Sequence, residues 1–512
     1  MKSGNTGKEL YRQLRALPWS QLWTEEVARF DRATPRERFD TVSVIRAVGV
    51  VFSESGPAEQ RDAVKQWLRK LLKDPEEKVR RYAIAALPKI GAGAADEAEL
   101  LALLRAGIGE REAKYLGQTL DKIGGEATLE ILAATGAASP QTEQKVRASV
   151  ARSQSPSAIR LDSTIADFAG LRIHLRGREG LERFVRDEVE AQGRFRVLDV
   201  QPGLVAITAS AAFTLADIFA LRCFGTVGFV LGRVKSADDA GYVEALASVI
   251  ASPLSQRLLT ALTTGSIRYR LDFVAKGHQR AAVRQVANRA YALCPQILND
   301  AREAPWAIDV HPAAQGDSVE LRPRLSPDPR YAWRLDDVPA ASHPPLAACM
   351  ARLAGRQENE CVWDPFCGSG LELIERTLLG GVRRVFGTDL SADAIEIADR
   401  NFAAARFGSV AARFTRCDFR DFAATGKLPP RSLTLIISNP PLGGRVRIPD
   451  IRGLFDDLFA TAASLLAPGG RLVFTNPLRM ENPHPSLKLH SRQVVDMGGF
   501  DCRMELYRKL AR

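Results

Sequence analysis

Four short stretches in the C-terminal part of the sequence have a strand-like pattern and end in Asp or Asn, and this pattern constrains the fold more than any other. The stretches "CVWD", "VRRVFGTD", "ARFTRCD" and "LTLIISN" are typical of consecutive β-strands. Their last residues are Asp364, Asp389, Asp418 and Asn439. In a doubly wound parallel sheet the carboxyl ends of the strands line one crevice, and ligands bind there. The sequence therefore predicts a single site built from these four residues.

A glycine turn follows the first of these strands. In "DPFCGSGLELIERTLLGG", Gly368 and Gly370 stand between the strand and a helix whose N-terminus faces the turn. Helix N-termini present free N–H groups, and glycine lets a ligand approach the backbone, so a small anionic or carboxylate-bearing cofactor fits. Leu373 replaces the third glycine of a dinucleotide fingerprint, which disfavours NAD without excluding it. Asp389 lies 19 residues beyond Gly370, where an acidic side chain can accept both ribose hydroxyls.

The fourth strand ends in a corner, "NPPLGG", whose backbone is restricted at the two prolines and conformationally free at the two glycines. Pro440 and Pro441 fix the backbone after Asn439, whereas the two glycines that follow permit unusual conformations. The Asn439 side-chain oxygen and the Pro440 carbonyl can accept the two N–H bonds of an exocyclic amine. The nitrogen can then pyramidalise and direct its lone pair at a methyl donor, with little reorganisation. No general base is needed beforehand, because the product amine can lose its proton afterwards.

The order of these motifs closely resembles that of the S-adenosylmethionine-dependent amino-methyltransferases, over about residues 335–512. In that family the glycine turn holds the methionine part of the cofactor, the next two acidic residues bind ribose and adenine, and N/D-P-P-Y/F is the catalytic corner. The resemblance implies that S-adenosyl-L-methionine is bound by Asp364, Phe366, Cys367, Gly368, Ser369, Gly370, Asp389, Leu390, Asp418, Phe419 and Asn439. It implies that the catalytic residues are Asn439, Pro440, Pro441 and Leu442.

Leu442 departs from the family pattern, which usually places Tyr or Phe there to stack on the target base. Stacking is worth roughly 1–3 kcal/mol per base. Either another aromatic residue supplies it, or base binding is weak, or the target is not a base.

Residues 1–155 have apolar residues at helical spacing, interrupted by Gly and Pro turns. "VRRYAIAALPKIG" and "EAKYLGQTLDKIG" align at an offset of 33 residues. The region resembles HEAT-type repeats, in which stacked helix pairs share a core and expose a long face. An ordinary helical bundle with accidental similarity is the alternative. We expect the region to bind a partner, an RNA or a protein, or to brace the rest of the chain.

Residues 160–330 mix short strands with helices, and their basic residues cluster around one strand and the helix after it. Arginines four apart share a helix face, so the cluster predicts a basic stripe that suits RNA, with a solvated helix face as the alternative. The pattern over about residues 165–325 resembles the THUMP domain and its ferredoxin-like companion, which grip RNA. The predicted RNA-binding residues are Arg268, Arg270, Lys276, Arg280 and Arg284, together with Arg445 and Arg447 beyond the N-P-P corner.

Composition agrees with several domains and a polyanionic partner. A chain of 512 residues is too long for one core, and the patterns divide it into 1–155, 160–330 and 335–512. The net charge of +11 favours nucleic acid as a partner. With no secretory signal and no long apolar run, we expect a cytoplasmic protein that does not bind membranes. The seven cysteines include no CxxC pair and have no histidine at metal-ligand spacing, which indicates reduced thiols and no metal.

The predicted fold is thus a helical HEAT-like region, an α+β THUMP/ferredoxin-like middle and an α/β Rossmann-like methyltransferase domain. The favoured function is methylation of an exocyclic amine of RNA, N2 of guanosine in tRNA or rRNA. One alternative is an amine methyltransferase that acts on protein glutamine or DNA adenine. The other is a non-catalytic RNA-binding protein with a vestigial pocket, against which the intact acidic series argues.

Overall fold

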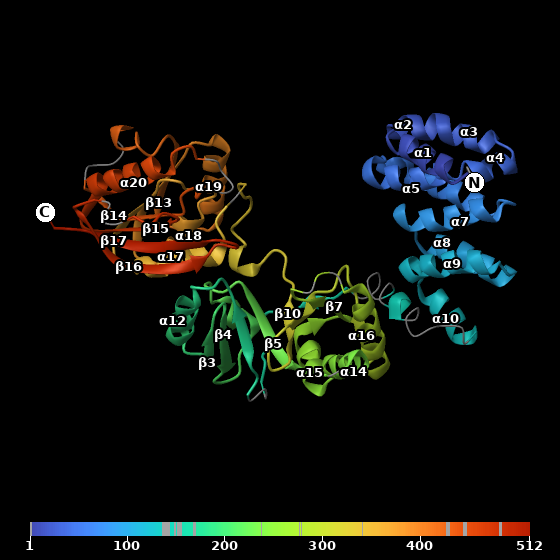
Figure 1. The fold of residues 1–512 in the computed structure, drawn as a ribbon, viewed down its shortest axis with the longest axis horizontal. Coiled ribbons are helices and arrows are strands. Elements are labelled where there is room, and N and C mark those ends of the chain that lie inside the picture. The colour runs from blue at the N-terminus through green and yellow to red at the C-terminus, as the bar shows by residue number, and fades with distance from the viewer. Residues whose placement is uncertain are drawn as a thin grey trace. The chain divides into compact units, whose positions relative to one another are not determined.

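The computed structural model divides the chain into two compact units (Figure 1). The first comprises Met1–Ile159 and Gly232–Val319, and the second comprises Arg160–Leu231 and Glu320–Arg512. The division into three domains stays a prediction. The structure describes residues 3–135, 144–147, 150, 156–166, 170–236, 238–275, 277, 279–339, 341–425, 431–443, 448–480 and 484–511.

The N-terminal part of the first unit is built of helices, as its apolar spacing predicts. In α6, for example, Val64, Leu68 and Leu71 recur every three or four residues, and all are buried. The helices are α1 (Ser3–Arg15), α2 (Trp19–Gln21), α3 (Ala28–Arg32), α4 (Pro35–Asp40), α5 (Ser43–Ser55), α6 (Arg61–Leu71), α7 (Glu77–Ala86), α8 (Ala94–Ala106), α9 (Glu110–Ile123) and α10 (Glu126–Thr135).

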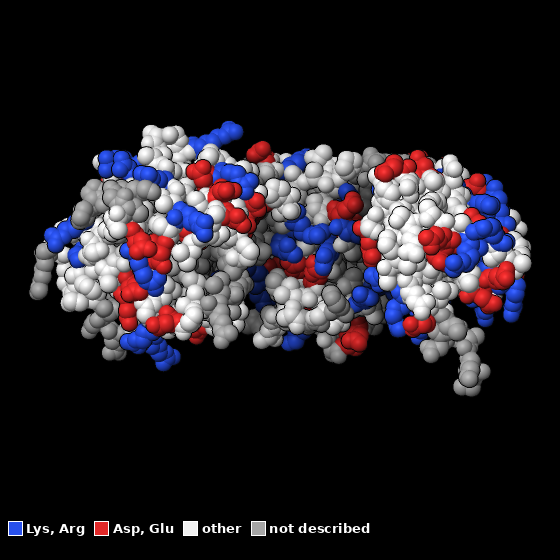
Figure 2. All heavy atoms as spheres, turned by 90° about the horizontal axis from the view of Figure 1, so that it is seen from above, with Lys and Arg blue, Asp and Glu red and all other residues white. Residues whose placement is uncertain are grey.

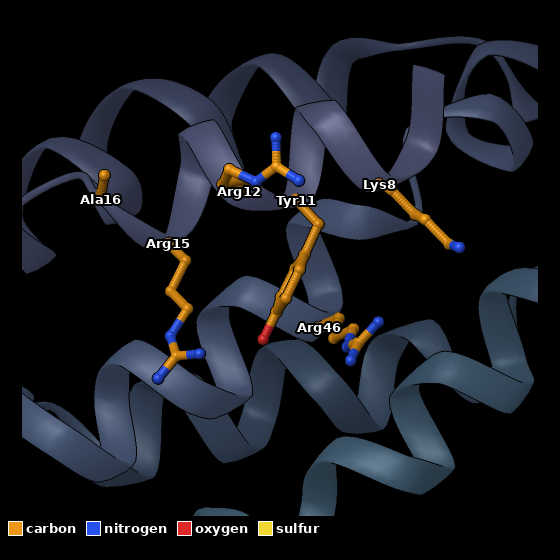
Figure 3. A pocket seen from close by; sticks show the side chains of 6 residues that line it. All are labelled: Lys8, Tyr11, Arg12, Arg15, Ala16 and Arg46. Atoms are coloured by element: carbon orange, nitrogen blue, oxygen red, sulfur yellow. The ribbon is translucent and has the colours of Figure 1, made fainter. Parts of the chain in front are cut away.

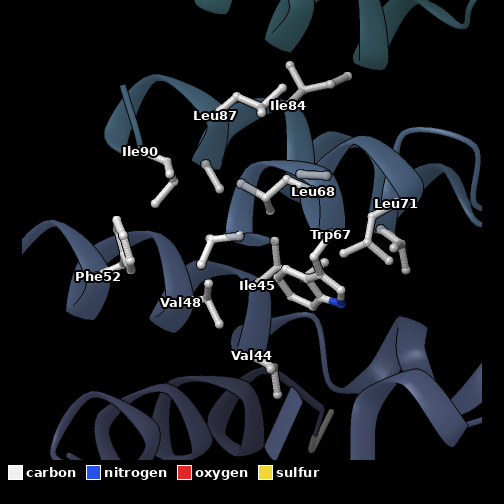
Figure 4. Packing of buried hydrophobic residues seen from close by; sticks show 14 of the residues in the cluster. Val44, Ile45, Val48, Phe52, Trp67, Leu68, Leu71, Ile84, Leu87 and Ile90 are labelled. Carbon is white, nitrogen blue, oxygen red and sulfur yellow. The ribbon is translucent and has the colours of Figure 1, made fainter. Parts of the chain in front are cut away.

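One apolar core runs through these helices, and the two aligned sequence copies face each other across it. Figure 4 shows Ile45 and Val48 of α5 beside Leu68 of α6 in this core. The copies occupy α7 and α9, which pack together. Arg80 of α7 forms a bidentate pair with the buried Glu112 of α9, with N···O distances of 2.7 and 2.8 Å. The helix pairing agrees with a repeat, and the HEAT assignment stays a prediction.

The remainder of the first unit mixes helices with three parallel strands, which belong to an eight-stranded sheet. Strand β7 pairs with β8 on one side and β9 on the other, and α14 packs on α16. Among the described helices, none alone has the length and apolarity to cross a membrane; α14 and α15 pass that test only jointly, as a pair bent by 42°. The elements are β1 (Ala158–Ile159), α14 (Asp239–Ile250), α15 (Pro253–Leu262), β6 (Thr263–Thr264), β7 (Ile267–Phe273), α16 (Arg280–Leu293), β8 (Ile297–Asn299) and β9 (Trp306–His311).

The second unit opens with antiparallel strands in the order β3-β4-β2-β5. Strands and helices therefore alternate here as the sequence predicts, while the THUMP assignment stays a prediction. Strands β5 and β10 each begin in one unit and end in the other. The elements are β2 (Ile173–Arg176), α12 (Glu182–Gln192), β3 (Phe195–Gln201), β4 (Leu204–Ala209), α13 (Leu215–Phe219), β5 (Thr226–Val234) and β10 (Asp317–Pro323).

The C-terminal part of the second unit is a seven-stranded sheet in the order β13-β12-β11-β14-β15-β17-β16. Strands β11 to β15 are parallel, and the β16–β17 hairpin is antiparallel. This confirms the predicted methyltransferase-like α/β fold. The elements are α17 (Pro344–Ala354), β11 (Glu360–Asp364), α18 (Leu371–Leu378), β12 (Val382–Asp389), α19 (Ala392–Ala404), β13 (Ala411–Arg416), β14 (Leu433–Ser438), α20 (Ile451–Leu465), β15 (Leu466–Asn476), β16 (Leu487–Asp496) and β17 (Asp501–Lys509).

Strand β11 is the topological switch point of this sheet, because β12 pairs with it on one side and β14 on the other. Chain order reverses there, so the carboxyl ends of β11 and β14 open a crevice. Two predicted strand ends need correction. Strand β13 ends at Arg416, before Asp418, whose carboxylate instead caps the backbone N–H of Arg420 at 2.9 Å. Strand β14 ends at Ser438, and Asn439 follows it, because Pro440 has no N–H to continue the ladder.

A buried ion cluster holds the amino end of β11 in place. Glu360 is fully buried, and its carboxylate pairs with the guanidinium groups of Arg376 in α18 and Arg471 in β15. Arg471 also donates a hydrogen bond of 3.2 Å to the carbonyl of Gly355, at the end of α17. One side chain thereby joins the central strand to α17, α18 and β15.

We predict that Glu360→Gln destabilises this sheet by about 3–5 kcal/mol, because two buried guanidinium groups lose their counter-ion. Glu358→Gln is the matched control, since Glu358 lies two residues away in an exposed pair with Arg356, and exposed pairs contribute about 0–1 kcal/mol. Hydrogen–deuterium exchange of β11 and β15 peptides gives both local free energies. Equal protection in the two variants would contradict the role assigned to the cluster.

Candidate functional site

Asp364, at the carboxyl end of β11, is fully buried and only half satisfied. Its Oδ1 accepts hydrogen bonds from the backbone N–H of Phe366, at 3.0 Å, and from the hydroxyl of Ser438. Among the described residues, Oδ2 has no hydrogen-bond partner. Burial, and then the charge of Glu372, raises the pKa of Asp364 well above its usual range. The Oδ2 atom of Asp364 is therefore buried without a hydrogen-bond partner among the described residues.

The glycine turn after β11 has the backbone that its sequence predicts. Gly368 and Gly370 have φ angles of 49° and 83°, in the left-handed region that favours glycine. A Cβ at Gly370 would lie only 3.3 Å from the Cβ of Ala398. Cys367 between them is buried, and burial raises the pKa of its thiol, so it fills space in the turn. Ser369 is buried too, and its carbonyl accepts a hydrogen bond of 3.0 Å from the Asn401 amide.

Asp389 joins the second strand to this turn. Its Oδ2 accepts a hydrogen bond from the backbone N–H of Gly368 at 3.1 Å, and its Oδ1 accepts one from Ser391 at 2.9 Å. Leu390 beside it is 67% exposed. The ends of β11 and β12 are thus tied together, with an apolar side chain uncovered next to the second carboxylate.

Asp418 and Phe419 stand beyond the third strand. The Asp418 Oδ2 is 2.9 Å from an Nη of Arg420, so its charge is partly compensated. The Phe419 ring is buried, with its centroid 4.9 Å from that of Phe366, which follows the first strand. The residues predicted on three different strand ends are therefore brought together around one turn.

The side-chain amide of Asn439 is held from both sides. Its Nδ2 donates a hydrogen bond of 2.8 Å to the hydroxyl of Ser342, just before α17, and its Oδ1 accepts one from the hydroxyl of Thr475 on β15. Pro440 is buried, and Pro441 and Leu442 are half-buried. The amide therefore has a fixed orientation at the carboxyl end of β14.

Sequence analysis missed three residues of this site: Ser342, Glu372 and Thr475. Glu372 is buried in the first turn of α18, its Oε1 has no hydrogen-bond partner among the described residues, and its carboxylate lies beside the Ser342 hydroxyl. Burial raises the pKa of Glu372 to about 7. The available signal was a charged residue inside the apolar run "LELI", whereas nothing local marks the serine or the threonine.

The predicted basic stripe is only partly present. Arg268 needs correction: it is 3% exposed and pairs with Asp300 at 3.2 Å, so it is not on the surface. Arg270 is exposed beside Asp272, and Arg280 and Arg284 are exposed on α16. Lys276, Arg445 and Arg447 lie outside the described residues.

The helical region carries a basic hollow, absent from the predictions, between α1 and α5. Figure 3 shows the lining side chains, and the hollow has a volume of about 560 Å³. The Arg46 guanidinium lies over the Tyr11 ring, 4.1 Å from its centroid. Among the described residues, neither Lys8 nor Arg46 makes an ion pair. The lining residues are Lys8, Tyr11, Arg12, Arg15, Ala16 and Arg46.

Comparison with known proteins gives one family and several relatives. The family model described as UPF0020, RMKL-like, methyltransferase domain, matches residues 331–482. A tRNA (guanine(10)-N2)-dimethyltransferase of Methanothermobacter thermautotrophicus is 29% identical over 184 residues, which are 34% of this chain and 52% of that protein. A ribosomal protein L11 methyltransferase of Desulfatibacillum aliphaticivorans is 32% identical over 113 residues, which are 19% of this chain and 35% of that protein.

The chain thus spans about half the length of the first relative and about a third of the second. Among solved structures, TrmN from Thermus thermophilus superposes with a TM-score of 0.51 at 21% identity. The superposition covers 66% of this chain and all of that one, and at this identity the likeness concerns the fold. Residues 331–482, which match the methyltransferase-domain model, contain the glycine turn, the strand-end carboxylates and the N-P-P corner.

Proposed function

We propose that this chain is an S-adenosylmethionine-dependent methyltransferase that acts on an exocyclic amine of RNA, N2 of guanosine in tRNA or rRNA. The observation that carries the proposal is the Asn439 amide, which is oriented by Thr475 and Ser342 at the end of the strand beside the glycine turn. An amide oxygen accepts two hydrogen bonds. Thr475 supplies one of them among the described residues, which leaves the second position for a substrate amine.

The strand ends fit the proposed cofactor, which supplies an electrophilic methyl group on a sulfonium when it is bound. The unpartnered Oδ2 of Asp364 suits an N–H donor of the methionine part, and the left-handed Gly368 and Gly370 leave the turn open to close approach. Asp389 would hold the ribose hydroxyls. Leu390 and Phe419 offer apolar surface for the adenine, and Asp418 an acceptor for its amine.

The corner would act on the target nitrogen by hydrogen bonding alone. The Asn439 oxygen and the Pro440 carbonyl accept the two N–H bonds, which withdraws the nitrogen lone pair from conjugation with the ring. Because the amide is already held by two side chains, little orientation has to be gained when the substrate binds. Leu442 is half-buried and has no aromatic ring, so stacking of the base would need another residue.

RNA as the substrate is supported by the relative that acts on guanine in tRNA and by the net charge of +11. The L11 methyltransferase among the relatives keeps a protein substrate as the second candidate. The proposal extends to THUMP-like RNA binding in the middle region, HEAT-like stacking in the helical region and a cytoplasmic location.

RNA would contact two groups of basic residues, one on α16 and one between α1 and α5. On the face drawn in Figure 2, Lys and Arg side chains gather in small groups interspersed with acidic ones. Arg280 and Arg284 lie on one exposed face of α16, and Lys8 and Arg46 line the hollow between α1 and α5. Because the lining of this hollow is positively charged, the helical region should bind RNA phosphate groups better than a protein surface with few acidic residues.

The substrate class is tested by incubating the protein with methyl-labelled cofactor and, separately, RNA, protein or DNA from cells that lack the chain. We expect RNA to take up the label as N2-methylguanosine. Transfer to the protein pool alone would replace RNA by the second candidate. Transfer to none of the three, by protein that binds the cofactor, would contradict the enzymatic proposal.

The roles within the site are tested by two alanine variants. Asn439→Ala should lower kcat roughly 10²–10³-fold, the effect of removing one preorganised hydrogen bond to the reacting group. It should leave S-adenosylhomocysteine affinity unchanged in calorimetry. Asp389→Ala should abolish that affinity, whereas Asp393→Ala, an exposed position four residues on, should not change it. Equal loss of affinity in the first two variants would contradict the division of roles.

RNA contact is tested by the salt dependence of tRNA binding. Two double variants are compared with the unsubstituted protein: Arg280→Glu with Arg284→Glu, and Lys8→Glu with Arg46→Glu. Each should weaken binding and make the negative slope of log K against log salt shallower by roughly 1–2, since each phosphate contact contributes about 0.7–0.9. Arg289→Gln is the control on α16, because Glu244 already neutralises Arg289 at 2.5 Å. An unchanged slope in a pair removes that surface from the RNA interface.

A further inference from the structure

Strand β11 carries a buried carboxylate at each end, and the two differ in whether a positive charge compensates them. Glu360 at the amino end has two guanidinium partners. Asp364 at the carboxyl end has no ion-pair partner among the described residues. Neither has Glu372, which lies in the first turn of α18, just after the glycine turn. Each of these two carboxyl groups keeps one oxygen without a hydrogen bond, although both are at most 3% exposed.

The two carboxyl groups belong to one cluster. The charge of Glu372 is the largest contribution after burial to the raised pKa of Asp364, which requires the two to be close. Ser342 lies beside Glu372 and also accepts the Asn439 amide hydrogen bond. Glu372 is thus linked through one hydroxyl to the corner where the methyl group would transfer.

The other charges around the cluster are already engaged. Glu375, on the next turn of α18, forms a bidentate pair with Arg222 at 2.7 and 2.8 Å. Arg334 contributes the smallest of the named effects on Glu372 and pairs with Asp337. Asp389 accepts two backbone hydrogen bonds. Burying two carboxylates with unmet oxygens is costly unless they take up protons or a cation with hydrogen-bond donors joins them.

We propose that Glu372 and Asp364 form a paired carboxylate site for the α-ammonium group of the cofactor's methionine part. The inference rests on the proposed function and assigns Glu372, which no motif identifies. An ammonium group has three donors and a positive charge, so it satisfies the two unmet oxygens and removes the repulsion between the carboxylates. Through Ser342, the same contact connects cofactor binding to the orientation of Asn439.

A proton should leave when the ammonium binds. Burial raises the pKa of Glu372 to about 7 and the pKa of Asp364 well above its usual range, so the free site binds protons at pH 7. A cation beside the carboxylate favours its ionised form and lowers this pKa. Binding at pH 7 should therefore release protons from this site, and Glu372 should contribute part of that release.

Isothermal titration with S-adenosylhomocysteine, in buffers of different ionisation enthalpy, measures both affinity and proton release. In Glu372→Gln, which keeps the side-chain shape, we expect affinity to fall roughly tenfold or more, because a charge-assisted hydrogen bond is lost. Proton release at pH 7 should also fall, because the amide has no proton to lose in this range. Affinity and proton release equal to those of the unsubstituted protein would overturn the proposal.

Two controls separate this proposal from a general loss of structure. 5′-Methylthioadenosine has no ammonium group, so its affinity should be the same with and without Glu372→Gln. Glu396→Gln, at an exposed position of α19, should change neither ligand's binding. Weakening of methylthioadenosine to the same degree in Glu372→Gln would show a structural role and overturn the ammonium site.

Thermal unfolding without ligand gives an independent readout. When burial raises the pKa of a carboxyl group in the folded state, the folded protein becomes less stable as the pH rises through that pKa. At pH 8, Glu372→Gln should therefore have a higher melting temperature than the unsubstituted protein. The difference should close below the pKa of an unfolded glutamate. A lower melting temperature at pH 8 would contradict an uncompensated carboxylate. Failure of the unsubstituted protein to bind S-adenosylhomocysteine would instead refute the proposed function itself.

Discussion

The cost of burying charge in strand β11 organises the C-terminal domain. Glu360 and Asp364 lie at the two ends of a five-residue strand that is buried along its whole length. At the amino end, Arg376 and Arg471 compensate the charge and join the strand to its neighbours. At the carboxyl end the protein supplies hydroxyl and backbone donors to one oxygen only. The charge at the amino end is therefore compensated within the protein. At the carboxyl end one oxygen keeps no partner among the described residues, and we propose that a ligand supplies it.

The sheet topology converts this asymmetry into a site. Because β11 lies between β12 and β14, its carboxyl end adjoins both Asp389 and Asn439. Asp389 binds the backbone of the glycine turn directly, at Gly368. Asn439 is fixed by side chains from outside its own strand, Ser342 and Thr475. The crevice thus depends on the parallel register of the sheet, and its corner depends on contacts from Ser342, just before α17, and from Thr475 of β15.

Most features of this domain could be predicted from the sequence, because the patterns that indicate them span only a few residues. Gly368 and Gly370 adopt the left-handed backbone that a tight turn before a helix requires, and Pro440 ends β14 for want of an N–H group. The doubly wound sheet and its shared crevice were predicted from four consecutive strand patterns with polar residues at their ends.

What the sequence by itself determined is the set of elements and the polar residues at their ends, since periodicity and turn chemistry act over a few residues. Only the tertiary structure decided which charges are compensated. Arg268 was expected on the surface, but β8 covers just the first residues of β7 and brings Asp300 against it, while Arg270 stays exposed. Glu372 was passed over within an apolar helix pattern, yet it lies beside Asp364 and Ser342. Pairing of buried charges depends on distances between residues far apart in the chain, and no local pattern encodes those distances.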